Sequence, residues 1–184
     1  MNFPAAHLEK LAKLVDSVYN GAVSSEIVQA DTKIPVLKIN SRDIRKVVEL
    51  VVHHKDLGFT YLNTISGTHL AETREDESLD LKGFEMFYVF SNSQDFSSLA
   101  IKTTLPENNP EIDTIDDFSG SANWFEREIF DLLGVNFKNS QDLRRIMLPP
   151  DWEGHPLRKD FKEGSHYNGI PTTRSSELEA IRIE

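Results

Sequence analysis

Residues 122–161 read ANWFEREIFDLLGVNFKNSQDLRRIMLPPDWEGHPLRKDF, and this stretch decides how the chain is organised. Its first third has the period of an amphipathic helix, with apolar side chains recurring on one face. Ser119 or Ser121 can cap the start of that helix, and Gly134 can close it. The pattern therefore predicts a helix over residues 119–135.

Behind this helix, from Lys138 to Glu184, the sequence shows no sustained periodicity. A structureless run of this length is uncommon inside a compact domain, unless it is disordered or ordered by another protein. Disordered segments usually have few aromatic and bulky apolar residues, whereas residues 138–163 have both, and Pro149-Pro150 stiffens their backbone. We expect residues 136–184 to form an extended arm that docks on a partner. Disorder is the alternative, and after residue 163 the composition favours neither.

Upstream, residues 1–105 have the pattern of a small α+β domain. Two amphipathic helices are expected, one around residues 8–18 and one that Ser41 caps and Gly58 ends. The order helix–strand–strand–helix–strand–strand–strand favours a small mixed or antiparallel sheet with the two helices on one face. The expected strands are residues 23–29, 35–39, 59–66, 83–91 and 98–105. The fold class is then α+β, followed by a C-terminal helix and a long extended arm.

Three segments between these elements are expected to be irregular. Asp31-Thr32-Lys33 is a hairpin turn between the first two strands. Residues 71–82, AETREDESLDLK, are densely charged and suit an exposed loop. Residues 106–118, with two prolines and five carboxylates, suit a connector. The chain is thus divided into a domain over 1–105, this connector, the helix and the arm.

The composition excludes several classes of function. The chain has no cysteine, which excludes disulfides, thiolate zinc sites, cysteine nucleophiles and ordinary iron–sulfur ligation. Its net charge of −10 argues against a nucleic-acid binder. No apolar run approaches the ~18 residues of a membrane helix, and the N-terminus has no secretory signal. Any link to a membrane is expected to pass through a partner.

The charged side chains of the helix suggest ion pairs in preference to catalysis. Glu126 and Glu128 point about 200° apart on a helix, so they cannot share one substrate. Arg127 and Asp131, four residues apart, are expected to pair on one surface. An independent hydrolase with one of these glutamates as its base is the least favoured alternative.

Histidines and tryptophans are the remaining candidates for a site. His155 has acidic neighbours but no second histidine, so it does not predict a metal site. His69 stands alone and is expected at the surface or capped. No nucleotide-binding or hydrolase motif occurs. Arginines beside aromatic residues are instead typical of protein interfaces, with Trp152 as the natural anchor.

The quoted stretch resembles the family mark of the C subunit of NADH-quinone oxidoreductase, which is part of respiratory complex I. Residues 1–105 resemble the family only in their α+β order. Family members usually carry Gly-His-Pro before the Asp-Leu-Arg, where this chain has Asn139-Ser140-Gln141, which leaves the branch of the family open. The elements that carry the resemblance are Asn123-Trp124, Glu126-Arg127-Glu128, Asp131, Gly134-Val135, residues 142–146 and residues 152–160.

The resemblance implies a non-redox structural subunit in the peripheral arm of an ion-translocating oxidoreductase, which passes electrons from NADH or another donor to quinone. The chain would pack against the quinone-site, hydrogenase large-subunit-like subunit and lie near the small, cluster-bearing subunit. Iron–sulfur clusters and quinone would belong to those partners, and this chain would bind no cofactor. It would sit peripherally at the cytoplasmic face of an energy-coupling membrane.

Related subunits serve the deazaflavin-dependent dehydrogenase of methanogens, the photosynthetic ferredoxin–plastoquinone complex and membrane-bound hydrogenases. A transient docking factor is a further alternative. No catalytic, cofactor-binding or metal-binding residue is expected. The expected partner interface comprises Trp124, Glu126, Arg127, Glu128, Asp131, Asp142, Arg144, Arg145, Trp152, His155, Leu157, Arg158, Lys159 and Asp160.

Overall fold

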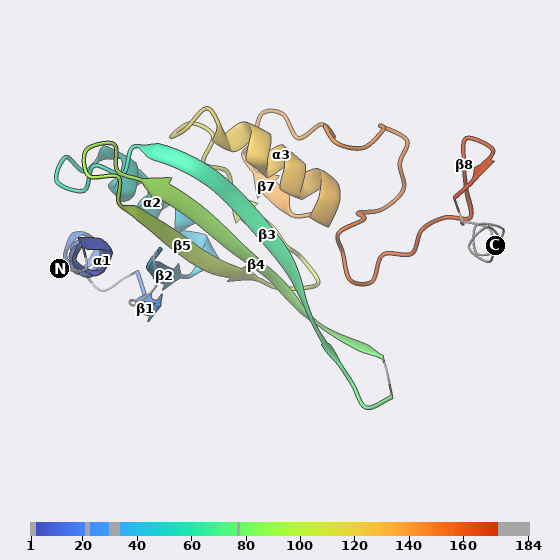
Figure 1. Cartoon of the computed structure of the whole chain (residues 1–184), viewed down its shortest axis with the longest axis horizontal. Coiled ribbons are helices and arrows are strands. Elements are labelled where there is room, and N and C mark those ends of the chain that lie inside the picture. Colours follow the sequence, from blue (N-terminus) through green and yellow to red (C-terminus); the bar gives the residue numbers. More distant parts are fainter. Residues whose placement is uncertain (1–2, 21–22, 30–33, 77, 173–184) are drawn as a thin grey trace, which may run out of the picture.

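The computed structural model describes residues 3–20, 23–29, 34–76 and 78–172. Its helices and strands give an α+β fold, as the sequence predicts (Figure 1). Among the described residues no helix is long and apolar enough to cross a bilayer. In chain order the elements are α1 (Phe3–Tyr19), β1 (Ser25–Gln29), β2 (Val36–Ile39), the 3-10 turn η1 (Ser41–Asp43), α2 (Ile44–His53), β3 (Tyr61–Thr73), β4 (Leu79–Ser91), β5 (Ser98–Leu105), β6 (Glu111–Asp113), α3 (Ala122–Leu133), β7 (Asn136–Lys138), β8 (His166–Tyr167) and β9 (Ile170–Pro171).

The central sheet has five strands in the order β1-β2-β5-β4-β3. Strands β2 and β5 run parallel, and the other neighbours pair antiparallel, so the sheet is mixed. The predicted strands are all present. The predicted hairpin between β1 and β2 is confirmed as an antiparallel pair, and its turn at residues 31–33 lies outside the described residues.

One face of the sheet carries the core. In β4 the side chains Phe84, Met86, Tyr88 and Phe90 are buried, while the residues between them are only half-buried. This alternation is typical of a sheet covered on one side. All three helices contribute to the same cluster as these strand residues, and Figure 1 shows α3 lying along β3. The helix residues of the core are Leu11, Val15, Ile44, Val47, Val48, Val51, Ala122, Ile129 and Leu133.

The predicted exposed loop at residues 71–82 is wrong. Strands β3 and β4 continue through it as a paired ribbon, with only the tip left out of the ladder. The ribbon extends past the end of β5, because Phe84 already pairs with Leu105, the last residue of that strand. In Figure 1 it projects from the body of the sheet. Charged side chains misled the prediction because a two-stranded ribbon exposes most of its surface.

Helix ends and the connector also differ from expectation. Asn40, not Ser41, caps the turn before α2, and α2 ends at His53, well before Gly58. Gly134 does close α3, with a φ of 76°. Inside the predicted connector, β6 pairs in parallel with β7, so the first residues of the predicted arm belong to the folded body. Phe137 is accordingly buried in the core.

Candidate functional site: a clasped arm

Asp131, in the last turn of α3, holds the arm by its backbone. Its side chain is fully buried. Oδ2 accepts hydrogen bonds from the N–H groups of Ile146, Met147 and Leu148 at 3.0, 2.7 and 2.9 Å, and Oδ1 accepts from the Arg145 guanidinium at 2.8 Å. Burial acts to raise the pKa of the carboxyl, but these four donors outweigh it and lower the pKa overall. Asp131 is therefore ionised, and the arm turns around its carboxylate. We call this carboxylate with its four donors, from residues 145–148, the Asp131 socket.

A second part of the arm closes over the end of α3. The His155 ring lies against Gly134, where a Cβ atom would come within 2.6 Å of it. His155 Nδ1 donates to the Asp131 carbonyl oxygen at 2.9 Å, and the Leu157 N–H donates to the Leu132 carbonyl oxygen at 3.0 Å. These bonds satisfy carbonyl groups that a helix end leaves unpaired. The arm thus forms a clasp over the carboxyl end of α3.

His69, on β3, ties the arm to the sheet. Its buried ring accepts the N–H of Lys159 at Nδ1, 3.0 Å away, so Nε2 carries the proton and donates to Glu107 at 2.7 Å. Arg158 reaches the same Glu107 carboxylate at 2.6 Å and lies 5.1 Å from the centre of the Phe84 ring. The expectation of a surface or locally capped histidine is wrong. No local signal could reveal this contact, because His69 and Lys159 are 90 positions apart.

The clasp leaves several apolar side chains of the arm exposed. Across residues 139–170 no side chain is fully buried. Met147 is 54% exposed and Leu157 is 57% exposed, although the backbone of both residues is hydrogen-bonded. Trp124, at the other end of α3, is also 57% exposed. The arm is therefore held largely by polar contacts and presents some of its apolar side chains, Met147 and Leu157 among them, to solvent.

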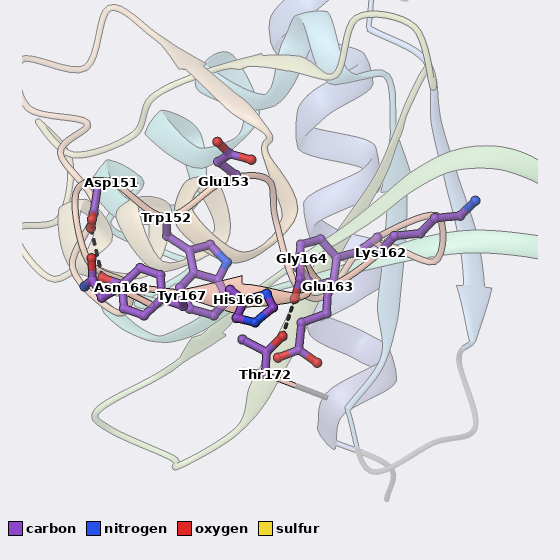
Figure 2. Close-up of a pocket in the computed structure, with 11 residues that line it drawn as sticks. Asp151, Trp152, Glu153, Lys162, Glu163, Gly164, His166, Tyr167, Asn168 and Thr172 are labelled. Atoms are coloured by element: carbon purple, nitrogen blue, oxygen red, sulfur yellow. Dashed lines mark hydrogen bonds between the residues drawn. The ribbon is translucent and has the colours of Figure 1, made fainter. Parts of the chain in front are cut away.

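Trp152 packs against the chain's own tail, outside the core of the sheet (Figure 2). Its ring lies 5.1 Å from the ring of Tyr167, whose hydroxyl donates to Asp151 at 2.9 Å. The indole N–H is buried and has no hydrogen-bond partner among the described residues. Beside this ring pair lies an open pocket of about 290 Å³, at the lower end of the range for small-molecule sites.

Glu126, a predicted partner-interface residue, does not lie at the surface. It is fully buried in the chain's own core, where it accepts hydrogen bonds from the Thr114 hydroxyl and from the Ile115 N–H at 2.8 Å. Burial is the main cause that raises the pKa of Glu126, to about 7. The Glu126 side chain is thus unavailable to a partner in this structure. The buried carboxylate of Asp131, also a predicted interface residue, is unavailable for the same reason.

The expected ion pair between Arg127 and Asp131 is wrong. Asp131 pairs with Arg145, and Arg127 Nε donates to the carbonyl oxygen of Arg144 at 3.0 Å. Arg127 also lies 3.8 Å from Asp142. The spacing of four residues would allow Arg127 and Asp131 to pair with each other. The arm crosses this face of α3, however, and each of the two residues bonds to the arm instead.

The remaining predicted interface residues lie at or near the surface. Asp142 and Arg144 form a bidentate ion pair with each other, which is the first cause that lowers the pKa of Asp142. Asp160 pairs with Arg158 at 3.0 Å. Glu128 is half-buried. Within the described ranges no three histidine or carboxylate side chains gather as metal ligands do.

Comparisons with known proteins agree on one family. A family model described as "Respiratory-chain NADH dehydrogenase, 30 Kd subunit" matches residues 37–167. The chain is 33% identical to the C/D subunit of NADH-quinone oxidoreductase from Ectopseudomonas mendocina over 71% of its own length, which is 22% of that relative. It is 36% identical to "NADH-quinone oxidoreductase subunit 5" of Thermus thermophilus over 63% of its length and 57% of the relative.

A solved structure shares the fold. It is a chain of the membrane-bound sulfane sulfur reductase, described as an archaeal respiratory membrane complex. The likeness has a TM-score of 0.56 with 18% identity, and it covers 83% of this chain and 86% of that one. Both curated relatives extend well beyond the part that this chain matches.

Proposed function

Because this chain belongs to the family of the 30 kDa subunit of the respiratory-chain NADH dehydrogenase, we propose that it is a structural subunit of a complex I-type oxidoreductase. Its role is assembly in the peripheral arm of an ion-translocating complex, at the cytoplasmic face of the membrane. Iron–sulfur clusters and quinone belong to the partner subunits in this proposal. The chain itself binds none of them.

The clasped arm is the observation that carries the proposal. An arm whose backbone is already fixed loses little conformational entropy when it docks, which favours tight association. Its uncovered side chains include Met147 and Leu157, and Trp124 stands exposed on the helix beside it. Interfaces are enriched in methionine and aromatic side chains of this kind. A rigid arm with exposed apolar side chains suits permanent docking on another protein.

The partner we propose is the quinone-site subunit, with the cluster-bearing small subunit adjacent. The name of the Ectopseudomonas relative joins two subunit letters, C and D, in one polypeptide, of which this chain matches 22%. Such a joined chain supports direct packing of this subunit on a larger one. The same subunit of a related complex, with another electron donor, is the second candidate, and the fold shared with the archaeal sulfane sulfur reductase favours keeping it.

Replacement of one exposed arm residue tests the role. Leu157→Glu adds a charge to a side chain that is 57% exposed in the isolated chain. The free energy of unfolding of the isolated chain should change by less than about 0.5 kcal/mol, as at other surface positions. The amount of this chain that co-purifies with the membrane complex should fall about tenfold or more, because a buried charge without a partner is costly in an interface.

Phe96→Glu is the matched control, since Phe96 is 86% exposed in the turn between β4 and β5, away from the arm. It should leave the complex intact. Normal assembly of the Leu157→Glu variant would rule out docking through this arm. The set of subunits in the purified wild-type complex separates the NADH-linked complex from a related one, and a chain recovered at much less than one copy per complex would indicate a transient docking factor.

A further inference from the structure

The β3–β4 ribbon, residues 70–82, projects from the sheet (Figure 1) and has no role in the docking proposed for the arm. Its two strands pair with each other beyond the last residue of β5, so neither has a second neighbour in the sheet. Gly83 marks where the ribbon leaves the sheet: its φ is 93°, and a Cβ atom there would lie 2.2 Å from the Leu105 carbonyl oxygen. Only glycine fits this position. The projection is therefore built into the sequence (Figure 1).

One face of the ribbon is charged and satisfied internally. Glu72 pairs across the strands with Asp80. Arg74 bonds to Asp80 at 2.9 Å, and Lys82 lies 3.3 Å from Glu72. These ion pairs show that the four side chains lie on one face of the ribbon. This face needs no partner.

The opposite face is mostly apolar and only partly covered. The ladder places Ala71 across from Leu81 and Thr73 across from Leu79. Leu79 is 45% exposed, and the other three side chains are at best half-buried. A two-stranded ribbon by itself is only marginally stable in water. Packing its apolar face against another element makes it stable. The structure therefore lacks a cover for this face.

The charge at the tip of the ribbon indicates what kind of surface could bind its apolar face. Residues 72–82 hold five acidic and two basic side chains, a net charge of −3. Both basic residues, Arg74 and Lys82, are engaged in the internal pairs. Among the described residues Glu75 has no ion pair, and Asp76 bonds only to Ser78. An anionic membrane surface would repel such a tip, whereas a basic protein surface would attract it.

We propose that the ribbon is a second docking element: its apolar face, with Leu79 and Leu81, binds a partner polypeptide of the same assembly whose basic side chains meet the acidic tip. This inference rests on the proposed function, since it requires a permanent complex. The ribbon and the clasped arm then contact the assembly at two separate places. Two attachments on one rigid body strengthen binding more than either does alone.

Site-specific photocrosslinking in the purified, intact complex tests the proposal. The photoreactive residue p-benzoylphenylalanine replaces Leu79 in one variant and Glu72, on the opposite face, in the matched control. The position-79 variant should give roughly fivefold more adduct than the position-72 variant, because alternate residues of a strand point to opposite faces. The adduct should join this chain to another subunit, in a segment rich in lysine or arginine.

Any of these results would overturn the proposal: equal adduct from both positions, adduct with lipid, adduct with a second copy of this chain, or an acidic target segment. Absence of adduct at position 79, in a complex that holds one copy of the chain, would also overturn it while leaving the proposed function intact. Absence of the chain from the complex would instead contradict the proposed function.

Discussion

The sheet body and the clasped arm are held by different forces. The body buries apolar side chains from its strands and three helices in one continuous core. Between residues 139 and 170 the arm buries none of its side chains fully, yet its backbone bonds at three places to α3 and at one to β3. A close-packed core fixes the shape of the body by excluding water. Hydrogen bonds and ion pairs fix the position of the arm without requiring that its apolar side chains be buried. The difference separates a body held together by its core from an arm held in place by polar contacts, and the proposed interface lies on that arm.

Asp131→Asn should have the largest effect and should separate the two regions. The change removes the charge that four donors share and leaves the Arg145 guanidinium without its buried partner. We expect the arm to lose about 3 kcal/mol of docking free energy. Hydrogen exchange of the amides of Ile146, Met147 and Leu148 should become fast, while the amides of β4 and β5 stay protected.

Asp142→Asn is the control for this variant, because it removes an ion pair at the surface, where the side chain of Arg144 is 81% exposed. It should leave the three amides protected. If the Asp131→Asn variant also leaves them protected, the socket does not hold the arm.

Glu126→Gln should affect the body and not the arm, and its effect depends on pH. The folded-state pKa of about 7 lies above the ordinary value of 4.5, so the folded chain retains a proton that the unfolded chain loses. The stabilisation is therefore complete below pH 4.5 and is lost as the pH rises through 7. Glutamine mimics the neutral form of the side chain. At pH 8 the free energy of unfolding of the variant should therefore exceed that of wild type by up to about 3 kcal/mol.

Urea unfolding followed by far-UV circular dichroism at pH 5 and pH 8 measures this difference. Glu128→Gln, at a half-buried neighbouring position, is the control and should follow wild type at both pH values. A wild-type chain whose free energy of unfolding does not fall between pH 5 and pH 8 relative to Glu126→Gln would show that Glu126 is ionised throughout.

Glu107→Gln should have a smaller effect, limited to the tie between arm and sheet. The Glu107 carboxylate accepts from both His69 and Arg158, and its side chain is 21% exposed. An amide oxygen can still accept from His69, but the charge that Arg158 meets is lost. We expect a loss of about 1 kcal/mol at this tie. The amide of Lys159 should exchange faster, and the amides at the Asp131 socket should not; equal changes at both would mean that the arm detaches as one unit.

The sequence was most informative where the pattern was local and periodic. Helix α3 with its Gly134 stop and the order of strands were predicted because apolar spacing and caps act over a few residues. The ribbon at residues 71–82 was missed because its strands are stabilised by cross-strand pairs, which charge and composition do not reveal. Trp152, predicted as an anchor for a partner, packs on Tyr167 of its own tail.

The geometry of the candidate site could not be predicted for a related reason. Asp131, Arg145 and His155 are all predicted interface residues, but their contacts with one another depend on how an irregular segment folds back over a helix. His69 and Glu107 lie in distant parts of the sequence and carry no motif. The role of the surface residues toward a partner stays a prediction.

The most direct measurement compares backbone and side-chain protection of one residue, Met147, in the isolated chain and in the purified complex. Its N–H bonds to Asp131 while its side chain is 54% exposed. The amide should exchange slowly in both samples, and hydroxyl-radical oxidation of the methionine sulfur should be fast in the isolated chain and strongly reduced in the complex. Fast amide exchange in the isolated chain, or equal oxidation in both samples, would contradict a prepared arm that docks through its exposed apolar side chains.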